Sequence, residues 1–133
     1  MGEDGRVNRA VMPTTIAPPA ARYAHAVVSE GGGRLLHTSG VVPIAPDGHV
    51  PDGLAEQAEV VWSNLAAILA EAAMAVTDIV SVTTYVVVGN DLAPVMAARD
   101  RVFAGHVAAS TLVTVPALVR PEWQLEVAIV ASH

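Results

Sequence analysis

The sequence contains no cysteine and no lysine. All seven basic residues are arginines. The lack of cysteine excludes disulfide bonds, thiolate chemistry and cysteine-ligated metals, and it weakly favours a reducing compartment. The lack of lysine excludes a Schiff-base nucleophile and the lysine of a Walker-type phosphate loop. Any chemistry of this chain therefore depends on carboxylates, imidazoles, hydroxyls or guanidinium groups.

Positive charge and long apolar runs are also scarce. The formal net charge is −6 at pH 7 and the isoelectric point is near 5.1. Binding to a nucleic-acid backbone needs a basic face, so nucleic acid is a poor candidate as a partner. No apolar run is long enough for a membrane span, and the first residues lack the basic start and apolar core of a secretion signal. We therefore expect a cytoplasmic protein.

The length and the apolar content indicate one domain that needs a partner. A chain of 133 residues is the size of a single domain. The sequence predicts an extended N-terminal arm over 1–20, which holds Pro13, Pro18 and Pro19, followed by one domain over 21–133. Hydrophobic residues make up 53% of the chain and the mean hydropathy is +0.48. This surplus of apolar surface predicts an oligomer.

Hydrophobic periodicity and turn residues predict an alternation of strands and helices. The predicted strands are 26–29, 34–39, 79–88, 110–115 and 123–131, with a further short strand within 41–52. Helices are predicted at 52–73 and 91–103, with Asp52 and Asp91 as N-caps. The order β-β-(β)-α-β-α-β-β indicates an α+β fold with both helices on one face of the sheet. The other face keeps many apolar side chains, which again indicates a partner subunit.

One carboxylate, Glu126, lies inside the last apolar stretch and needs a physical explanation. Burying an ionised carboxylate without a partner is costly, so Glu126 either points into water or lines a polar cleft that supplies donors. We interpret it as a cleft residue, with an ion pair between subunits as the structural alternative. The five histidines lack metal-binding spacing, which predicts no metal site. His25 and His37 are weaker candidates for a catalytic base.

Several short segments carry a family pattern in the same order along the chain. They are Arg22-Tyr23-Ala24-His25-Ala26, similar to P-Y-S-x-A; Thr38-Ser39-Gly40, similar to S-G; Glu56-Gln57 with Asn64-Leu65, similar to Q-(x)6-N-L; and Leu125-Glu126-Val127, similar to V-E-I. Together they resemble the RidA family, also called the YjgF or L-PSP endoribonuclease-like family. The resemblance covers roughly 22–131.

The resemblance implies a chorismate-mutase-like fold of the bacillus type, with a mixed sheet and a homotrimer whose sheets pack into a central barrel around three intersubunit clefts. In the best-known branch an Arg in a P-A-R-S motif binds the substrate carboxylate. A cleft Glu positions or activates the water that hydrolyses an enamine or imine to a keto acid and ammonia. No cofactor is implied, because an imine carbon is already electrophilic.

Carried onto this chain, the resemblance gives the catalytic role to Glu126. Substrate contacts are expected from Tyr23, Ser39, Gly40, Ala109, Ser110 and Thr111.

The sequence departs from the family pattern where the anion-binding Arg is expected. The corresponding stretch is 108–111, and the interpretation puts Ala109 in the place of that Arg. Alanine supplies neither the donors nor the charge of an Arg–carboxylate fork. Arg22 or Arg120 entering the cleft from another direction is an open alternative. The family's Asn and aromatic residue in the second helix are replaced by Met96 and Arg99, and Val41 replaces its Gln after S-G. We therefore expect a divergent branch with little deaminase activity toward amino-acid imines.

Two classes of function follow. The first is a trimeric small-molecule enzyme, deaminase-like or hydrolase-like, whose substrate is less negative, or larger and more apolar, than an amino-acid imine. The second is a non-catalytic trimeric protein that binds a metabolite or serves as an accessory protein. Ribonuclease activity, suggested by the family's alternative name, ranks third, because an acidic, lysine-free chain offers little to a phosphate backbone.

Overall fold

The computed structural model describes residues 7–19, 24–31 and 33–133. It contains six strands, two α-helices and one short 3-10 helix. In chain order these are β1 (Val7–Val11), β2 (Ala26–Glu30), β3 (Arg34–Thr38), α1 (Leu54–Glu71), η1 (Val76–Asp78), β4 (Ile79–Val87), α2 (Ala93–Phe103), β5 (Ala109–Val115) and β6 (Leu125–Ser132).

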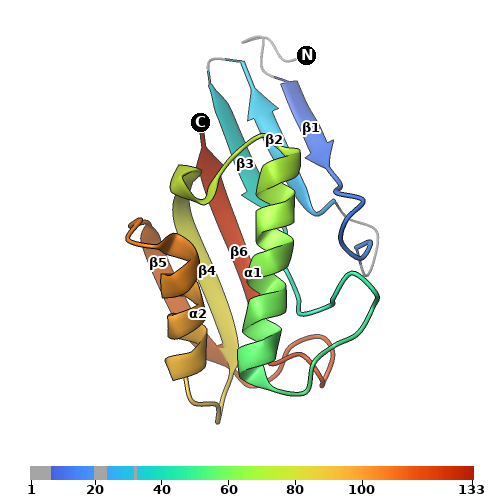
Figure 1. Ribbon diagram of the computed structural model, residues 1–133, viewed down its shortest axis with the longest axis vertical. Coiled ribbons are helices and arrows are strands. Elements are labelled where there is room, and N and C mark those ends of the chain that lie inside the picture. Colours follow the sequence, from blue (N-terminus) through green and yellow to red (C-terminus); the bar gives the residue numbers. More distant parts are fainter. Residues whose placement is uncertain (1–6, 20–23, 32) are drawn as a thin grey trace.

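The strands form one mixed sheet with the order β1-β2-β3-β6-β4-β5 (Figure 1). Strands β4 and β5 are parallel, and every other pair is antiparallel. The parallel pair needs a crossover, and α2 supplies it. The sheet inserts β6, the last strand, between β3 and β4, so Glu126 lies in the middle of the sheet rather than at an edge.

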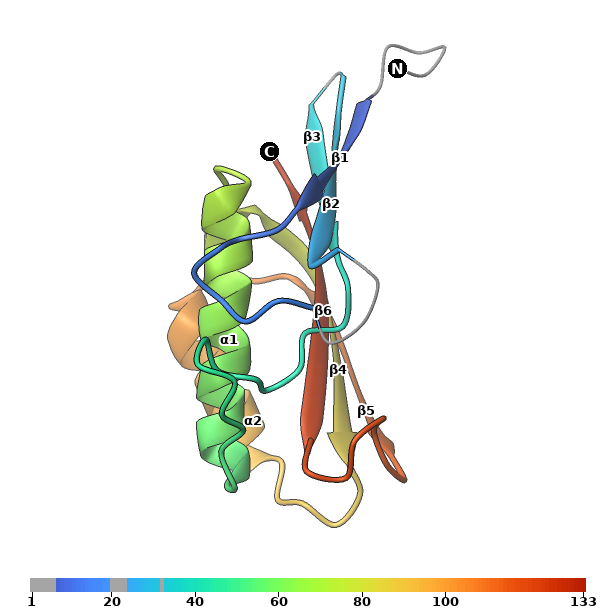
Figure 2. The same cartoon turned by 90° about the vertical axis from the view of Figure 1, so that its right-hand side faces the viewer.

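Both helices cover the same face of the sheet, as predicted (Figure 2). The core lies between the sheet and the two helices. Strand β6 reflects this arrangement, since its residues alternate between buried on the helix side and half-buried on the other side. Leu125, Val127 and Ile129 point to the helices and are almost fully buried. Each such side chain contributes roughly 1.5–3 kcal/mol by leaving water. Helix α1 buries an apolar stripe of Ala58, Val61, Leu65, Ile68 and Leu69. It also buries Trp62, which makes an edge contact with Phe103 at 5.4 Å between ring centroids.

Two predictions about local structure are wrong. Residues 7–11, expected in an extended arm, form strand β1, which pairs with β2 from Val7↔Glu30 to Val11↔Ala26. The stretch 41–52 forms only an isolated bridge between Val41 and Val127 instead of a strand, because prolines interrupt it.

The helix caps also differ from the predicted ones. Helix α1 begins after Gly53 without a side-chain cap, so Asp52 is not its N-cap. Helix α2 begins after Leu92, one residue beyond the predicted Asp91, although the Asp91 carboxylate still accepts a hydrogen bond from the Ala93 N–H at 3.0 Å.

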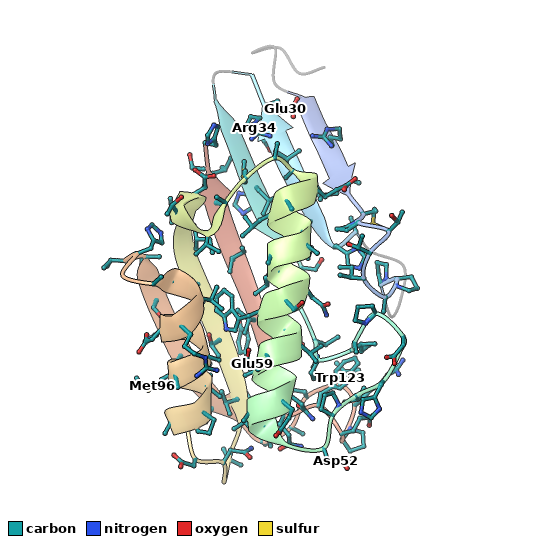
Figure 3. The ribbon with its side chains drawn as sticks, in the orientation of Figure 1. Glu30, Arg34, Asp52, Glu59, Met96 and Trp123 are labelled. Atoms are coloured by element: carbon teal, nitrogen blue, oxygen red, sulfur yellow. The ribbon has the colours of Figure 1, made fainter. Side chains whose placement is uncertain are left out.

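A buried glutamine on α1 fixes the loop that leads into β6. The Gln57 Nε2 donates to the backbone carbonyls of Pro51 at 2.7 Å and Glu122 at 2.8 Å. Its Oε1 accepts the Gln124 N–H at 2.8 Å. Gln57 is fully buried, and these bonds satisfy its amide. Trp123 lies in the same loop and is buried (Figure 3). The start of β6, and with it Glu126, is therefore tied to α1.

Candidate functional site

Glu126 lies on the face of the sheet that the helices leave open. Its neighbours Leu125 and Val127 are buried on the helix side, so strand alternation directs Glu126 the other way. Its antiparallel partner on β4 is Tyr85, which is half-buried on the same face. Tyr85 was missed by sequence reasoning, because only the strand register brings it to Glu126.

The Glu126 side chain packs against the backbone of Gly40. A Cβ added to Gly40 would lie 2.6 Å from the Glu126 Cδ and 2.9 Å from its Cγ, which is closer than real carbon contacts allow. Gly40 follows β3, and the bridge between Val41 and Val127 holds this segment beside β6. Glycine is thus the residue that leaves space for the carboxylate. The expected substrate contact of Gly40 stays a prediction.

Burial raises the pKa of the Glu126 carboxyl above its ordinary value. Desolvation disfavours the charged form, and within the part of the chain that the structure describes no side chain donates a hydrogen bond to this carboxylate. A carboxyl with a raised pKa can hold a proton and return it, which suits general acid–base chemistry.

The other expected site residues divide between the two faces of the sheet. Ala109 and Thr111 pair with Ser81 and Thr83 on β4, and they share the open face with Glu126. The Ser39 hydroxyl donates to the Ala24 carbonyl at 2.7 Å, so it holds the strand end next to Gly40.

Ser110 lies on the helix face, where Arg99 of α2 donates to its hydroxyl at 3.3 Å. The same guanidinium also donates to Asp100 at 3.1 Å and 3.3 Å. The interpretation that puts Ala109 in the place of the family's Arg stays a prediction. Neither Ala109 nor Ser110 is an Arg, and the nearby guanidinium comes from Arg99. The sequence pattern marked Arg99 only as the residue that replaces the family's aromatic one.

The remaining candidates lie elsewhere. Tyr23 and Arg22 fall outside the described residues. Arg120 is exposed and its guanidinium lies over the ring of Trp123, 5.2 Å from the centroid. His37 is exposed on β3. Within the described ranges no group of three or more His, Asp or Glu residues could hold a metal ion. In the same residues, no helix is long and apolar enough to cross a membrane.

The six-stranded mixed sheet with two helices on one face defines an α+β fold, and Glu126 lies on the other face. Residues 14–133 match the family described as Endoribonuclease L-PSP. The chain belongs to this family, the RidA/YjgF family that the motifs resemble.

Two curated relatives are named for reactions on reactive intermediates. The chain is 39% identical over 75 residues to 2-iminobutanoate/2-iminopropanoate deaminase of Escherichia coli, which covers 56% of this chain and 59% of that protein. It is 31% identical over 75 residues to the putative reactive intermediate deaminase TdcF of E. coli, which covers 56% of this chain and 58% of the relative. The matches thus span somewhat more than half of the length of these relatives.

Solved structures share the fold over nearly the whole chain. The E. coli YjgF gene product has a TM-score of 0.82 with 29% identity, covering 92% of this chain and 97% of that one. A Thermotoga maritima protein described as a putative endoribonuclease has a TM-score of 0.85 with 28% identity, covering 94% and 97%. E. coli TdcF with bound serine has a TM-score of 0.84 with 24% identity, covering 94% and 98%, which shows the fold alone.

Proposed function

We propose that this protein is a homotrimeric hydrolase that converts an enamine or imine to a carbonyl compound and ammonia, with Glu126 as its acid–base group. The observation that carries the proposal is the Glu126 carboxyl, which lies on Gly40 at the open face and has a raised pKa. The similarity to proteins named as imine deaminases supports the reaction class.

In the proposed reaction Glu126 handles protons while water is the nucleophile. The ionised carboxylate accepts a proton from water as the water oxygen attacks the imine carbon, which gives a carbinolamine. The protonated carboxyl passes that proton to the imine nitrogen, which completes the neutral carbinolamine. The carboxylate then carries the proton of the new hydroxyl to the same nitrogen, so the C–N bond breaks, ammonia leaves and the carbonyl forms. Burial of Glu126 favours both transfers, because it brings the carboxyl pKa closer to neutral pH.

The trimer is part of the proposal, because the open sheet face supplies an apolar surface for assembly. Val27 on β2 and Val113 on β5 are exposed by 38% and 40% on this face, and the half-buried residues of β6 lie between their strands. Strands from neighbouring subunits packed on this face would bury these side chains and enclose Glu126 in a cleft.

The substrate is proposed to carry less negative charge than an amino-acid imine, which places the chain in a branch without the family's anion-binding Arg. Ala109, on the open face, supplies no charge, and Arg99 is already paired with Asp100 on the helix face. Within the described residues no guanidinium faces Glu126 on the open side of the sheet. A substrate carboxylate would therefore lie near a buried acid without compensation.

The test compares neutral imines with the carboxylate-bearing imines that amino-acid oxidases generate, with ammonia release measured in both cases. Wild type is expected to act on the neutral imines and to be nearly inactive on the carboxylate-bearing ones. With the neutral imines, Glu126→Gln is expected to release ammonia roughly 10²–10⁴-fold more slowly than wild type. Arg99→Ala is expected to leave this preference unchanged. The opposite result would be fast turnover of the carboxylate-bearing imines by wild type and loss of this turnover in Arg99→Ala. That result would make Arg99 the anion-binding group and would contradict the proposed preference for neutral substrates.

A non-catalytic metabolite-binding or accessory role is the second candidate, favoured by the absence of a donor to Glu126 in the described part of the chain. In that case a ligand would bind wild type and Glu126→Gln with similar affinity, and no turnover would be measured with either imine series. The cytoplasmic location, the lack of a cofactor and the lack of nucleic-acid binding stay predictions from sequence.

A further inference from the structure

A small, partly open cavity lies between α1, the segment before β2 and the segment after β3. Its volume is about 30 Å³, and it is lined by Ile16, Ala17, Pro18, Pro19, His25, Ser39, Gly40, Val41, Val42, Ile44 and Asn64. A cavity of this volume holds one water-sized molecule when it offers polar partners. Gly40 belongs both to this lining and to the contact with Glu126, so the cavity lies behind the residue that supports the candidate site.

Two buried polar atoms of the lining have no hydrogen-bond partner in the part of the chain that the structure describes. They are the His25 Nδ1 and the Asn64 Oδ1. Asn64 is only 5% exposed. Buried polar groups are nearly always satisfied, and each one left without a partner costs about 1–3 kcal/mol. Two such atoms around one cavity indicate a bound molecule that serves both.

The other hydrogen bonds of these side chains define what the two atoms require. The Asn64 Nδ2 donates to the Ile44 carbonyl at 2.9 Å, so the amide is oriented and its Oδ1 is left as an acceptor. The His25 Nε2 lies 2.9 Å from the Ala17 carbonyl, which can only accept, so the Nε2 carries the proton. In the neutral ring the Nδ1 is then also an acceptor. Both atoms therefore require a donor.

We infer that this cavity is a binding site for one small molecule with at least two hydrogen-bond donors, which is water or ammonium. The bound molecule bridges His25 and Asn64 and thereby joins the segment before β2 to α1. This inference is independent of the proposed hydrolase reaction. The two are connected only if the bound molecule is ammonium, since the proposed reaction releases ammonia.

The tautomer of His25 is the first test, and it needs no variant. In ¹⁵N-labelled wild type, at a pH where the ring is neutral, long-range ¹H–¹⁵N correlations should show a protonated Nε2 and an accepting Nδ1. Exposed His37 serves as the internal control and should show a mixture of tautomers. A His25 ring protonated on Nδ1 instead would overturn the inference, because the cavity would then already offer a donor.

Occupancy is the second test and separates the two sources. Cross-relaxation from water to His25 in ammonium-free buffer assigns the site to water. A saturating His25 shift with ammonium chloride, absent with equal sodium chloride, assigns it to ammonium. Asn64→Leu should abolish either signal, while Ser63→Leu, an exposed neighbour on α1 outside this lining, should retain it. A dry cavity, with neither signal in wild type and no solvent density in a crystal structure, would refute the site.

Discussion

At the scale of single residues, Glu126 and Gly40 depend on each other. The carboxylate occupies the volume that any side chain at position 40 would need, so the glycine is required for space rather than for a special backbone angle. Desolvation raises the pKa of the same carboxyl. Because no described residue donates to this half-buried carboxylate, its desolvation lowers stability at neutral pH.

Gly40→Ala tests this dependence. The added methyl group should displace the Glu126 side chain and destabilise the fold, while in a Glu126→Ala background it should cost much less. We expect a coupling free energy of about 0.5–3 kcal/mol from a double-mutant cycle measured by denaturant unfolding. Additive effects of the two substitutions would show that the close contact is absent in solution.

Glu126→Gln should stabilise the protein at neutral pH. The folded-state pKa lies above the unfolded one, so the folded state binds the proton more tightly and wild type loses stability as pH rises between the two values. Glutamine does not titrate, so the variant lacks this loss. The difference in the free energy of unfolding between variant and wild type should disappear at a pH below both the folded-state and the unfolded-state pKa. Unfolding curves at several pH values and one protein concentration measure it. A less stable variant at neutral pH would indicate a cationic partner for Glu126.

At the scale of elements, two buried or half-buried polar side chains hold segments in place. Gln57 joins α1 to the loop before β6 through hydrogen bonds to Pro51, Glu122 and Gln124. Asp78 ends η1, where its carboxylate accepts the Ala75 N–H at 2.8 Å and lies 3.1 Å from the His133 ring nitrogen.

Gln57→Ala should destabilise the protein by roughly 2–4 kcal/mol, because it removes three hydrogen bonds and leaves their backbone partners buried. Chemical denaturation measures the loss, with Ser63→Ala, an exposed position of the same helix, as the control that should change stability little. If Gln57→Ala lowered the free energy of unfolding by less than the control does, water would be making the hydrogen bonds that Gln57 makes in wild type. The loop before β6 would then be held by other contacts.

Asp78→Asn should have the opposite pH signature to Glu126→Gln. The backbone N–H of Ala75 and the His133 ring lower the pKa of the Asp78 carboxyl. A lowered pKa adds stability above the unfolded-state value, and this stability disappears as pH falls through the folded-state value. The variant should therefore be less stable than wild type at neutral pH and equal to it in strong acid. An equal difference at every pH would assign the effect to packing instead.

At the scale of the whole molecule, the open sheet face decides whether the candidate site is complete. Light scattering of wild type should give a trimer. Val113→Glu, on the exposed part of this face, should shift the mass toward the monomer, because it would bury a charge in the interface. Ala66→Glu, exposed on α1 on the opposite side, is the control and should remain trimeric. A wild-type monomer at micromolar concentration would remove the intersubunit cleft.

The sequence by itself determined the order of the helices and strands from β2 to β6, apart from the strand wrongly expected within 41–52, and it determined the apolar stripe of α1. It also identified Glu126 as the single charged residue of its strand. These features follow from spacing along the chain, which sets the face of a helix or strand to which each residue belongs.

Only the tertiary structure decided which residues meet. It added β1 to the sheet, placed Gly40 against Glu126 and Tyr85 beside it, and separated Ser110 from Ala109. Strand pairing joins residues far apart in the chain, and a shift of one residue turns every side chain to the other face. The surroundings of the carboxylate, and hence its raised pKa, are therefore a property of the register rather than of the local sequence.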